Sequence, residues 1–599
     1  MPTKDSVISF LKRHKFAFLC ALVVGVLYVA PNILFVISLV EDYQGIPMME
    51  TPNEDFYLAR VQEILDGHPS VGSAAYWEYK NEPPISPPTG EFLYALPTLI
   101  FGISPSTTLV GSRFVLPALL FLLVYFLARR LTGDDDSMAG RITALASALF
   151  VTLGYDLIDY RSILHFLAGD APLSNGFLIW ARPVNPILGA IFLFSFLLCV
   201  HSIVAKKERV VRSMLGASVC MALMIASYFF SWGVALSVLA VLILFLLIRK
   251  EFCSARLLAL SVPLGLLLSF PYWLSVWGAT KSPWYASSVL RDGLFYTHYP
   301  LLNKLLIATL FFSLLCIVVD YLRKRKKGEP FQFEYWHLFC FSFLLGGLWA
   351  YSQQILTGRT IWPYHFVQYT IPLAGITVFT VLFHLRKNLW YLWHIGIAIG
   401  IFLSVIYGVY VQASTFSRFY SYDKERQSVA PFLEWLNQRE PDCVVLVVEE
   451  PLRLGLEGLI PAFTHCNTYH SPWVFSLMPD DRILHSYITR LYFRGISPES
   501  VGEYLKKADE AHGYLFSNWK GLYRLPQFPD FSDPIALERV QKLPQAYREF
   551  VSEDMSKILR KYRLNYVASV GALEPKILNA LPGTTLITVI GDVHLYAFR

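Results

Sequence analysis

Long runs of apolar residues, separated by short polar segments, fill the first two-thirds of the chain. Many of these runs approach or exceed the roughly 18–20 apolar residues that a helix needs to cross a bilayer. They predict about eleven membrane spans. The predicted spans are residues 16–40, 107–131, 140–155, 185–204, 212–230, 232–249, 257–278, 301–322, 335–353, 366–385 and 390–411. The pattern therefore predicts a polytopic α-helical membrane protein.

The pattern changes near residue 412, where charged residues, prolines and short apolar stretches replace the long runs. Short β-rich stretches predict strands, and 3.6-residue periodicity predicts helices at 429–438 and 498–510. The predicted strands are 442–448, 566–569, 585–590 and 594–598. We expect a membrane domain over 1–411, with a long first outer loop at 41–106, and an extracytoplasmic α/β domain over 412–599.

Composition supports the membrane assignment. Of 599 residues, 54 % are hydrophobic and only 16 % are charged, whereas about a quarter are charged in a typical soluble protein. The net charge of +6 comes mostly from basic residues that flank the spans. It does not indicate a nucleic-acid partner, and the expected surroundings are membrane lipids.

The basic residues predict the topology. Lys12 and Arg13 precede the first span, and Arg129 and Arg130 follow the second; further cations recur at every second boundary. Cytoplasmic loops carry such an excess of Lys and Arg, so the N-terminus is predicted to be cytoplasmic and the C-terminal domain extracytoplasmic. The first span is too long for a signal peptide and lacks a cleavage site. Short loops with basic flanks fit a bacterial inner membrane.

Residues 51–67 predict a short amphipathic helix just after the first span. Thr51 and Glu54 form a T-x-x-E capping box, and Pro52 suits the first helical position. Asp55 is left in the first turn, where the helix dipole favours a carboxylate. Asp55 is predicted to act as a general base and Arg60, on the same helix, as a phosphate binder. An ordinary interfacial helix with acidic residues at its start is the alternative.

Further ionisable residues gather in the predicted outer loops, where they are costly unless paired or functional. Arg161, Arg182, Arg359 and His365 suit an anionic lipid headgroup such as a phosphate or pyrophosphate. Singly, each has a structural alternative: Arg182 precedes a proline and can anchor a helix at the interface. Arg291, in another outer loop, is predicted to be a solvated loop residue.

Several motifs are missing from the sequence. It contains no Walker motif, no G-x-G-x-x-G after a strand and no H-E-x-x-H. Because the cytoplasmic loops are short, no soluble domain is expected to hold a nucleotide-sugar, and the donor of a transferase would be carried on a lipid. Cys443 and Cys466 both fall in the predicted outer domain, where a disulfide is permitted; the sequence leaves their pairing open.

The first outer loop resembles that of the GT-C superfamily of membrane glycosyltransferases, with an acid just after span one in the form D-F-Y-x-x-R (Asp55, Phe56, Tyr57 and Arg60). The stretch from Gly102 through Arg113 to Gly133 is also similar to the superfamily's second span. The resemblance implies a polyprenyl-phosphate or polyprenyl-pyrophosphate sugar donor and a first-loop acid that acts on the acceptor.

The chain also departs from that superfamily. The W-W-D-Y-G acceptor motif of oligosaccharyltransferases is missing, which puts glycosylation of protein sequons in doubt. Asp156 and Asp159 fall where metal-dependent members carry an acidic motif, but with different spacing. They are candidate ligands for a divalent metal, Mg or Mn; the alternative is that they pair with Arg161 to hold the loop.

These observations predict a glycosyltransferase that moves a sugar from a polyprenyl-linked donor to an acceptor at the outer face, with Asp55 as base. Single displacement would invert the sugar's configuration. The acceptor can be a protein, a lipid or a glycan. A transporter or flippase for an anionic lipid or glycolipid is the alternative, and a non-catalytic assembly or sensor protein is a third reading.

Overall fold

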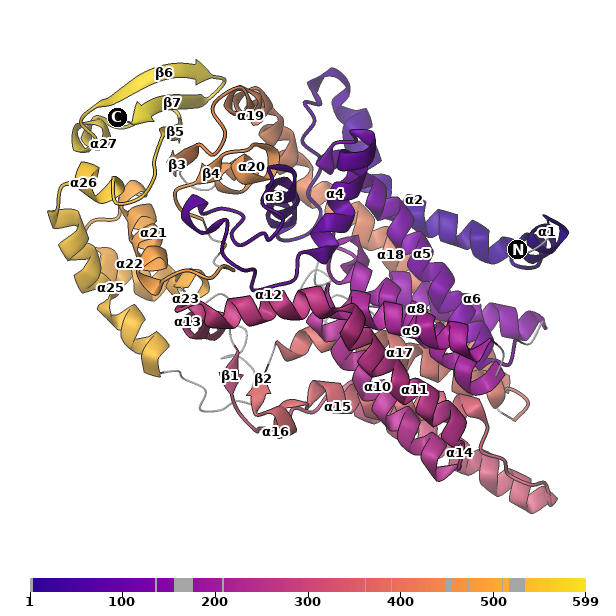
Figure 1. Ribbon diagram of the computed structural model, residues 1–599. Coiled ribbons are helices and arrows are strands. Elements are labelled where there is room, and N and C mark those ends of the chain that lie inside the picture. The colour runs from indigo at the N-terminus through magenta and orange to yellow at the C-terminus, as the bar shows by residue number, and fades with distance from the viewer. Residues whose placement is uncertain are drawn as a thin grey trace.

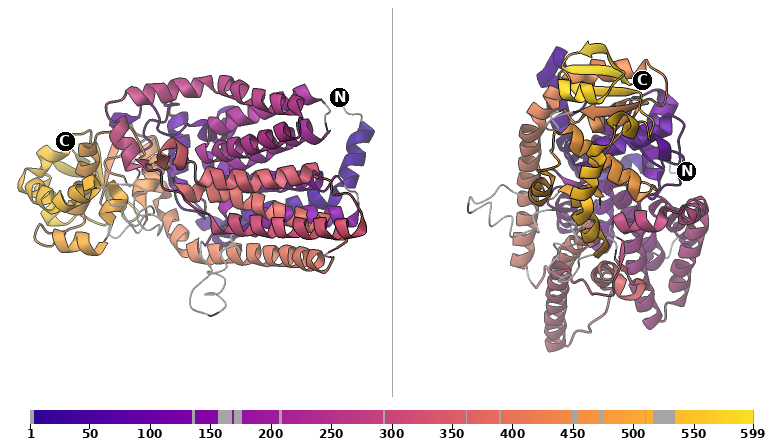
Figure 2. Two further views of the ribbon diagram at one scale, coloured as in Figure 1. Left: turned by 90° about the horizontal axis from the view of Figure 1, so that it is seen from below. Right: turned by 90° about the vertical axis from the view of Figure 1, so that its left-hand side faces the viewer.

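The protein combines a bundle of long helices with a smaller region built around a β-sheet (Figure 1). This structure, a computed structural model, describes residues 4–134, 137–155, 168, 176–206, 209–292, 294–360, 362–388, 390–448, 454–471, 473, 475–508, 510–515 and 534–598. The long helices run side by side, and the sheet region lies at one end of them (Figure 2).

Helices occupy all of the predicted spans. They are α2 (Lys15–Leu39), α5 (Pro105–Leu131), α6 (Met138–Leu153), α8 (Ile187–His201), α9 (Val210–Ile225), α10 (Phe229–Ile248), α11 (Phe252–Leu268), α14 (Lys304–Lys327), α15 (Tyr335–Tyr351), α17 (Pro363–His384) and α18 (Trp390–Arg426). Among the described residues, seven helices are long and apolar enough to cross a bilayer, and α6 and α9 are shorter apolar helices. The chain is an integral, multi-pass membrane protein.

The span predicted at 257–278 is broken in two. Helix α12 (Phe270–Lys281) follows α11 after a bend of 60°, and the pair makes an eighth span if it is counted as one. Pro271 lies in the first turn of α12, where proline is tolerated because its missing N–H would be unpaired anyway. The bend carries α12 toward α13 (Tyr285–Arg291), beside the sheet region (Figure 1).

The sheet region contains a five-stranded mixed sheet in the order β4-β3-β5-β7-β6. The strands are β3 (Val444–Val448), β4 (Asn467–Thr468), β5 (Tyr566–Val570), β6 (Thr584–Ile590) and β7 (Val593–Phe598). Strand β3 pairs in parallel with β4 and β5, whereas β7 pairs antiparallel with β5 and β6. Four strands lie where the sequence predicts them; the two-residue β4 was too short to detect.

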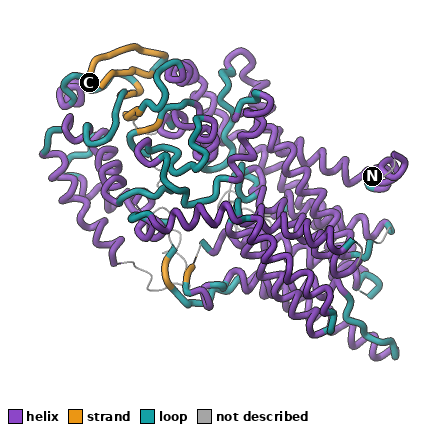
Figure 3. The backbone as a smooth tube through the Cα atoms, viewed as in Figure 1, coloured by secondary structure: helices purple, strands orange, loops and turns teal. Residues whose placement is uncertain are grey.

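Helices cover the sheet, whose strands form one end of the molecule (Figure 3). They are α19 (Ala430–Asn437), α20 (Leu456–Phe463), α21 (Asp480–Phe493), α22 (Val501–Ala508), α23 (Glu510–Leu515), α25 (Pro534–Ser552), α26 (Met555–Leu559) and α27 (Pro575–Ala580). Alternate residues of β3 enter two different cores, Val445 and Val447 on one side and Val444 and Leu446 on the other, as the two-residue period of a strand requires.

The first outer loop is part of the sheet region's core. It contains α3 (Glu54–Leu65) and α4 (Thr89–Phe101). Leu58 and Tyr76 from this loop are buried with Leu459 and Tyr487 from the C-terminal part of the chain. In addition, the compositional boundary at 412 lies within α18, which continues without a break to Arg426. The loop is thus held between the helical bundle and the sheet region.

Candidate functional site

A cluster of buried charges fixes the start of α3. The Arg113 guanidinium, from α5, lies 2.5 Å from Glu54 Oε2 and 3.6 Å from Glu50 Oε1, and all three residues are at most 2 % exposed. The Thr51 backbone N–H donates to Glu54 Oε1 at 2.6 Å, which is half of the predicted capping box. The Thr51 hydroxyl has no partner, and the helix begins at Glu54, after Asn53 in a left-handed conformation, rather than near Pro52. Glu54 is committed to these contacts.

Asp55 lies in the first turn of α3 and faces α20. Its Oδ1 accepts the backbone N–H of Phe56 at 2.9 Å, and its Oδ2 lies against Gly458 of α20. Burial raises the pKa of Asp55 above its ordinary value of 3.8, although the charge of Arg426 opposes this shift. A half-buried carboxylate with a raised pKa is a better proton acceptor than a solvated one.

Arg60 is fully occupied by a neighbouring acid. Its Nε donates to Glu91 Oε1 of α4 at 2.6 Å, and both side chains are nearly inaccessible to solvent. The guanidinium also packs over the Phe56 ring at 5.6 Å. These contacts join α3 to α4 and leave Arg60 in a structural pair.

Arg182, by contrast, has no acceptor among the described residues. Its Nε is buried without a hydrogen-bond partner, and its guanidinium lies 5.6 Å from the centre of the Tyr57 ring. Burial would lower the pKa of Arg182, but the phenolic oxygens of Tyr57, Tyr228 and Tyr364 outweigh it, so the pKa lies above its ordinary value. The side chain is therefore a half-buried cation whose Nε has no hydrogen-bond partner among the described residues.

His365 lies beside this cation. The Tyr228 hydroxyl hydrogen-bonds His365 Nδ1, and the indole of Trp362 packs edge-on against the imidazole at 5.1 Å. Since Tyr228 also lies close to Arg182, the starts of α10 and α17 and the chain before α8 converge here. The structure therefore brings Arg182 and His365 together, and Tyr57 of α3 lies against Arg182.

A row of aromatic side chains, called the aromatic wall below, runs from Phe56 on α3, next to Asp55, to Trp362, which packs against His365. Phe56 packs against Trp473 at 5.3 Å and Phe475 at 5.6 Å, and Phe475 packs against Trp362 at 5.9 Å. Trp473 and Phe475 belong to the S-P-W-V-F stretch of the C-terminal part, to which the sequence assigned no role. The sequence did contain a signal for their role, because two large aromatic residues lie beside a proline in a polar segment.

Asp292 is a second residue that the sequence reading missed. It is 3 % exposed, neither carboxylate oxygen has a hydrogen-bond partner in the described part of the chain, and burial raises its pKa to about 7 although Arg291 opposes the shift. Its backbone carbonyl accepts the Trp362 indole N–H at 2.5 Å, which places it behind the aromatic wall. Unpartnered buried carboxylates are rare and occur at functional sites more than elsewhere.

The prediction that Arg291 is a solvated loop residue is wrong. Arg291 is 1 % exposed, and its Nη1 donates to Asp480 Oδ1 at 2.6 Å and to the Met478 carbonyl at 3.2 Å. The partner acid lies 189 positions away, so the local sequence could not show the pairing. Arg291 ties α13 to the segment that leads into α21.

Of the remaining predicted site residues, Arg359 is described by the structure and lies apart from this cluster. Arg359 is exposed on the short strand β2 (Arg359–Thr360), opposite β1 (Phe295–Tyr296). Arg161, Asp156 and Asp159 lie outside the described residues.

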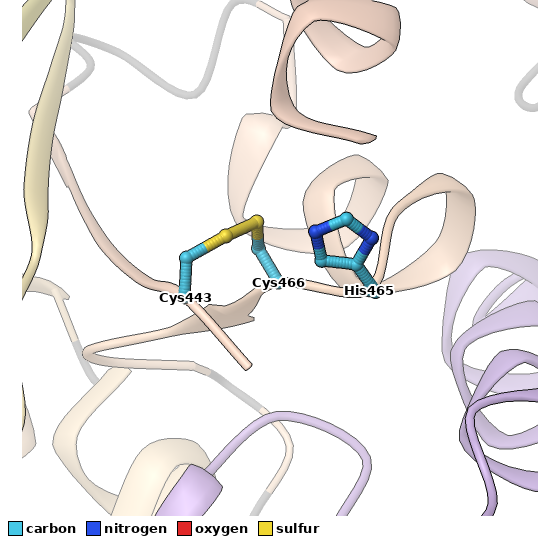
Figure 4. Close-up of side chains that lie close together, drawn as sticks. All are labelled: Cys443, His465 and Cys466. Carbon is cyan, nitrogen blue, oxygen red and sulfur yellow. A yellow bond between two sulfur atoms is a disulfide. The ribbon is translucent and has the colours of Figure 1, made fainter. Parts of the chain in front are cut away.

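One group of metal-type side chains occurs in the described part of the chain, namely Cys443, His465 and Cys466. The two cysteines form a disulfide between the start of β3 and the residue before β4 (Figure 4). A disulfide cannot supply the thiolates that a soft metal requires, and Mg or Mn prefers oxygen ligands. These three residues therefore do not fit a divalent metal. The disulfide also shows that Cys443 and Cys466, whose pairing the sequence left open, are bonded to each other.

No protein-family model matches the sequence, and no curated protein matches it. Among solved structures, ArnT from Cupriavidus metallidurans in the apo state is similar over 95 % of this chain and 97 % of its own, with 12 % identity and a TM-score of 0.43. The archaeal oligosaccharyltransferase AglB from Archaeoglobus fulgidus is similar over 98 % of this chain and 74 % of its own, with 13 % identity and a TM-score of 0.45. At these values the similarity carries no argument about function, and the chemistry has to be argued from the residues of this chain.

Proposed function

We propose that the chain is a GT-C-type glycosyltransferase that takes a sugar from a polyprenyl-phosphate or polyprenyl-pyrophosphate donor at the outer face of the membrane. One observation carries the proposal: the Nε of the half-buried Arg182 has no hydrogen-bond partner among the described residues, and its guanidinium lies over Tyr57 of the helix that carries Asp55. Burying an unpaired charge costs several kcal/mol, so such a site favours an anionic ligand. The phosphate of a membrane lipid would be such a ligand.

Arg182, with His365 and the Tyr228 hydroxyl beside it, would bind the phosphate. The guanidinium can donate two parallel hydrogen bonds to phosphate oxygens, and the surrounding phenols keep water away from it. The departing lipid phosphate is already a weak base, so its charge needs stabilisation rather than a proton. Arg161 and Arg359, from the other outer loops, would also contact the lipid phosphate.

Asp55 would act on the acceptor. Residues two apart on a helix do not share a face, so Asp55 and Tyr57 lie on different sides of α3, and Tyr57 is the residue against Arg182. A donor bound along the aromatic wall would then have its phosphate at Arg182 and its anomeric carbon toward Asp55. Attack from the side opposite the leaving group becomes possible.

The reaction is a single displacement. The acceptor oxygen or nitrogen forms the new bond to the anomeric carbon while the bond from that carbon to the phosphate oxygen breaks. The acceptor's proton passes to Asp55, and the bonding electron pair leaves with the lipid phosphate. The sugar's configuration is inverted. If a divalent metal takes part, Asp156 and Asp159 are its candidate ligands.

The test is chemical. Purified protein in lipid is supplied with radiolabelled polyprenyl-phosphate sugars, and cleavage of the sugar from the lipid is measured together with the anomeric configuration of any product. We expect protein-dependent cleavage with inversion. Movement of the intact lipid-linked sugar between leaflets without cleavage would overturn the proposal in favour of a flippase, and cleavage with retention would overturn the single displacement.

A further inference from the structure

The helical bundle has one end away from the sheet (Figure 2). Residues of the helix ends there, among them Arg130, Arg249 and His384, line a pocket of about 680 Å³. It forms where the last turns of α5, α8, α10 and α17 meet the start of α15. This is the end at which the basic residues gather, including the four cations in the last turn of α14. The pocket is thus remote from Asp55 and Arg182, and the proposed transfer reaction does not use it.

Two arginines of the lining have nitrogens to spare. Arg130 Nη1 donates to the Leu198 carbonyl at 2.5 Å and to the Ser202 hydroxyl at 2.8 Å, which holds the side chain in place. No described residue accepts from its Nη2 or Nε. Arg249 Nη1 donates to the Phe333 carbonyl at 2.6 Å and its Nε lies 3.0 Å from Glu251, which leaves its Nη2. Both guanidiniums can donate a hydrogen bond to a phosphate oxygen without giving up their present contacts.

The lining also carries two carboxylates, from Asp134 and Glu334. With two arginines and two acids, the formal charge of the lining is balanced, so a purely anionic ligand would meet repulsion as well as attraction. A ligand with one phosphate and one ammonium group would match both kinds of residue. A primary ammonium can also donate hydrogen bonds to the acids.

The surroundings of the pocket fit a lipid rather than a free headgroup. Next to Arg249, Leu247 and Ile248 of α10 are 44 % and 69 % exposed, and Phe333 on the rim is 41 % exposed. The Tyr335 ring lies beneath the Arg249 guanidinium at 4.8 Å. Aromatic and basic residues at this level of a membrane protein mark the interface, and the exposed apolar side chains offer a surface for acyl chains.

We propose that this pocket binds the headgroup of a phospholipid that carries both a phosphate and a primary ammonium, with the phosphate on Arg130 and Arg249 and the ammonium on Glu334 and Asp134. Basic pockets between membrane helices are known to hold lipid headgroups. The bound lipid would join the ends of five helices.

The test is native mass spectrometry of the purified full-length protein with phosphatidylethanolamine, phosphatidylglycerol or soluble glycerophosphoethanolamine. We expect selective retention of phosphatidylethanolamine and about a tenfold loss of affinity in Arg249→Gln and in Glu334→Gln, the effect of one charge-assisted contact. Lys326→Gln removes an exposed cation from the same end outside the pocket and should change nothing.

Arg130→Gln is the second cationic variant, and a melting curve without lipid shows whether each variant keeps its fold. Three results would overturn the proposal. Preference for phosphatidylglycerol, strengthened by Glu334→Gln, would mean an anion site. Equal competition by glycerophosphoethanolamine would mean a site for a free headgroup. Unchanged retention in both folded arginine variants would mean that the lipid binds elsewhere.

Discussion

Arg60 and Arg182 look alike in the sequence but differ in their partners. Arg60 Nε lies 2.6 Å from a Glu91 oxygen, whereas the buried Arg182 Nε has no partner. Both arginines follow a span and both were predicted to bind phosphate. What separates them is an acid 31 positions beyond Arg60, which is a tertiary contact that no local pattern reveals.

Replacing Arg182 should therefore weaken donor binding. We expect Arg182→Gln to raise the Kd for polyprenyl phosphate at least tenfold, because a charge-assisted contact in a buried site is lost. Lys281→Gln is the matched control: Lys281 is an exposed cation at the end of α12 and should leave the Kd unchanged. Equal affinity in Arg182→Gln and wild type, measured by titration in detergent, would remove Arg182 from the site.

Asp292 gives a prediction about pH and stability. Its pKa is raised from 3.8 to about 7, so between these values the folded state keeps a proton that the unfolded chain has lost. The contribution of Asp292 to stability should be most favourable below pH 4 and become less favourable as the pH rises toward 7, by an amount on the order of a few kcal/mol. Asp292→Asn should remove this fall and melt at a higher temperature than wild type at pH 8.

The control for this prediction is Asp442, whose contribution to stability changes with pH in the opposite direction. The Asp442 carboxylate lies 2.7 Å from the Lys80 ammonium, and although burial alone would raise its pKa, the bond to Lys80 holds that pKa below its ordinary value. The Asp442 carboxylate therefore stabilises the folded state at a pH above the pKa that it has in the unfolded chain. This stabilisation is lost as the pH falls. Asp442→Asn should therefore lower the melting temperature at pH 8; a pH profile of Asp292→Asn identical to wild type would refute the assignment.

At the scale of elements, the contact between α3 and α20 positions the candidate base. A Cβ added at Gly458 would overlap Asp55 Oδ2 and lie 3.0 Å from its Cγ. The Asp55 side chain is short, so its carboxylate would have to turn away. Because Gly458 has no side chain, α20 can approach the first turn of α3 this closely.

Gly458→Ala should reduce sugar transfer about a hundredfold while the melting temperature changes little, since a displaced base loses much of its contribution. Gly502→Ala is the control, because a Cβ at Gly502 in α22 meets nothing within 4 Å. Turnover by Gly458→Ala equal to that of the Gly502→Ala protein would show that Asp55's orientation is irrelevant to the reaction.

The sequence predicted the elements well where a single periodicity governs them. The apolar runs located helices at all eleven predicted spans, and alternation located β5 and β7. It did not predict that α3 starts at Glu54, because the cause is Arg113 of α5, nor that Trp473 and Phe475 contact Phe56 across more than 400 residues. Interactions of this kind depend on the fold and are invisible to local patterns.

For the whole molecule, the sheet region and the first outer loop share one core. The predicted division at residue 412 follows composition, whereas the packing unites both parts around α3. The topology, with the N-terminus cytoplasmic and the sheet region outside, stays a prediction from the basic flanks. It places the candidate transfer site at the outer face and the further pocket at the cytoplasmic face.

The most direct measurement is the initial rate of sugar release from a radiolabelled polyprenyl-phosphate donor in proteoliposomes, for wild type, Asp55→Asn and Asp42→Asn. Asp42 is an exposed acid of the same outer loop. The account predicts that Asp55→Asn binds donor as wild type does but turns over about 10²–10⁴ times more slowly, and that Asp42→Asn behaves as wild type. Wild-type turnover by a correctly inserted Asp55→Asn protein would contradict the account.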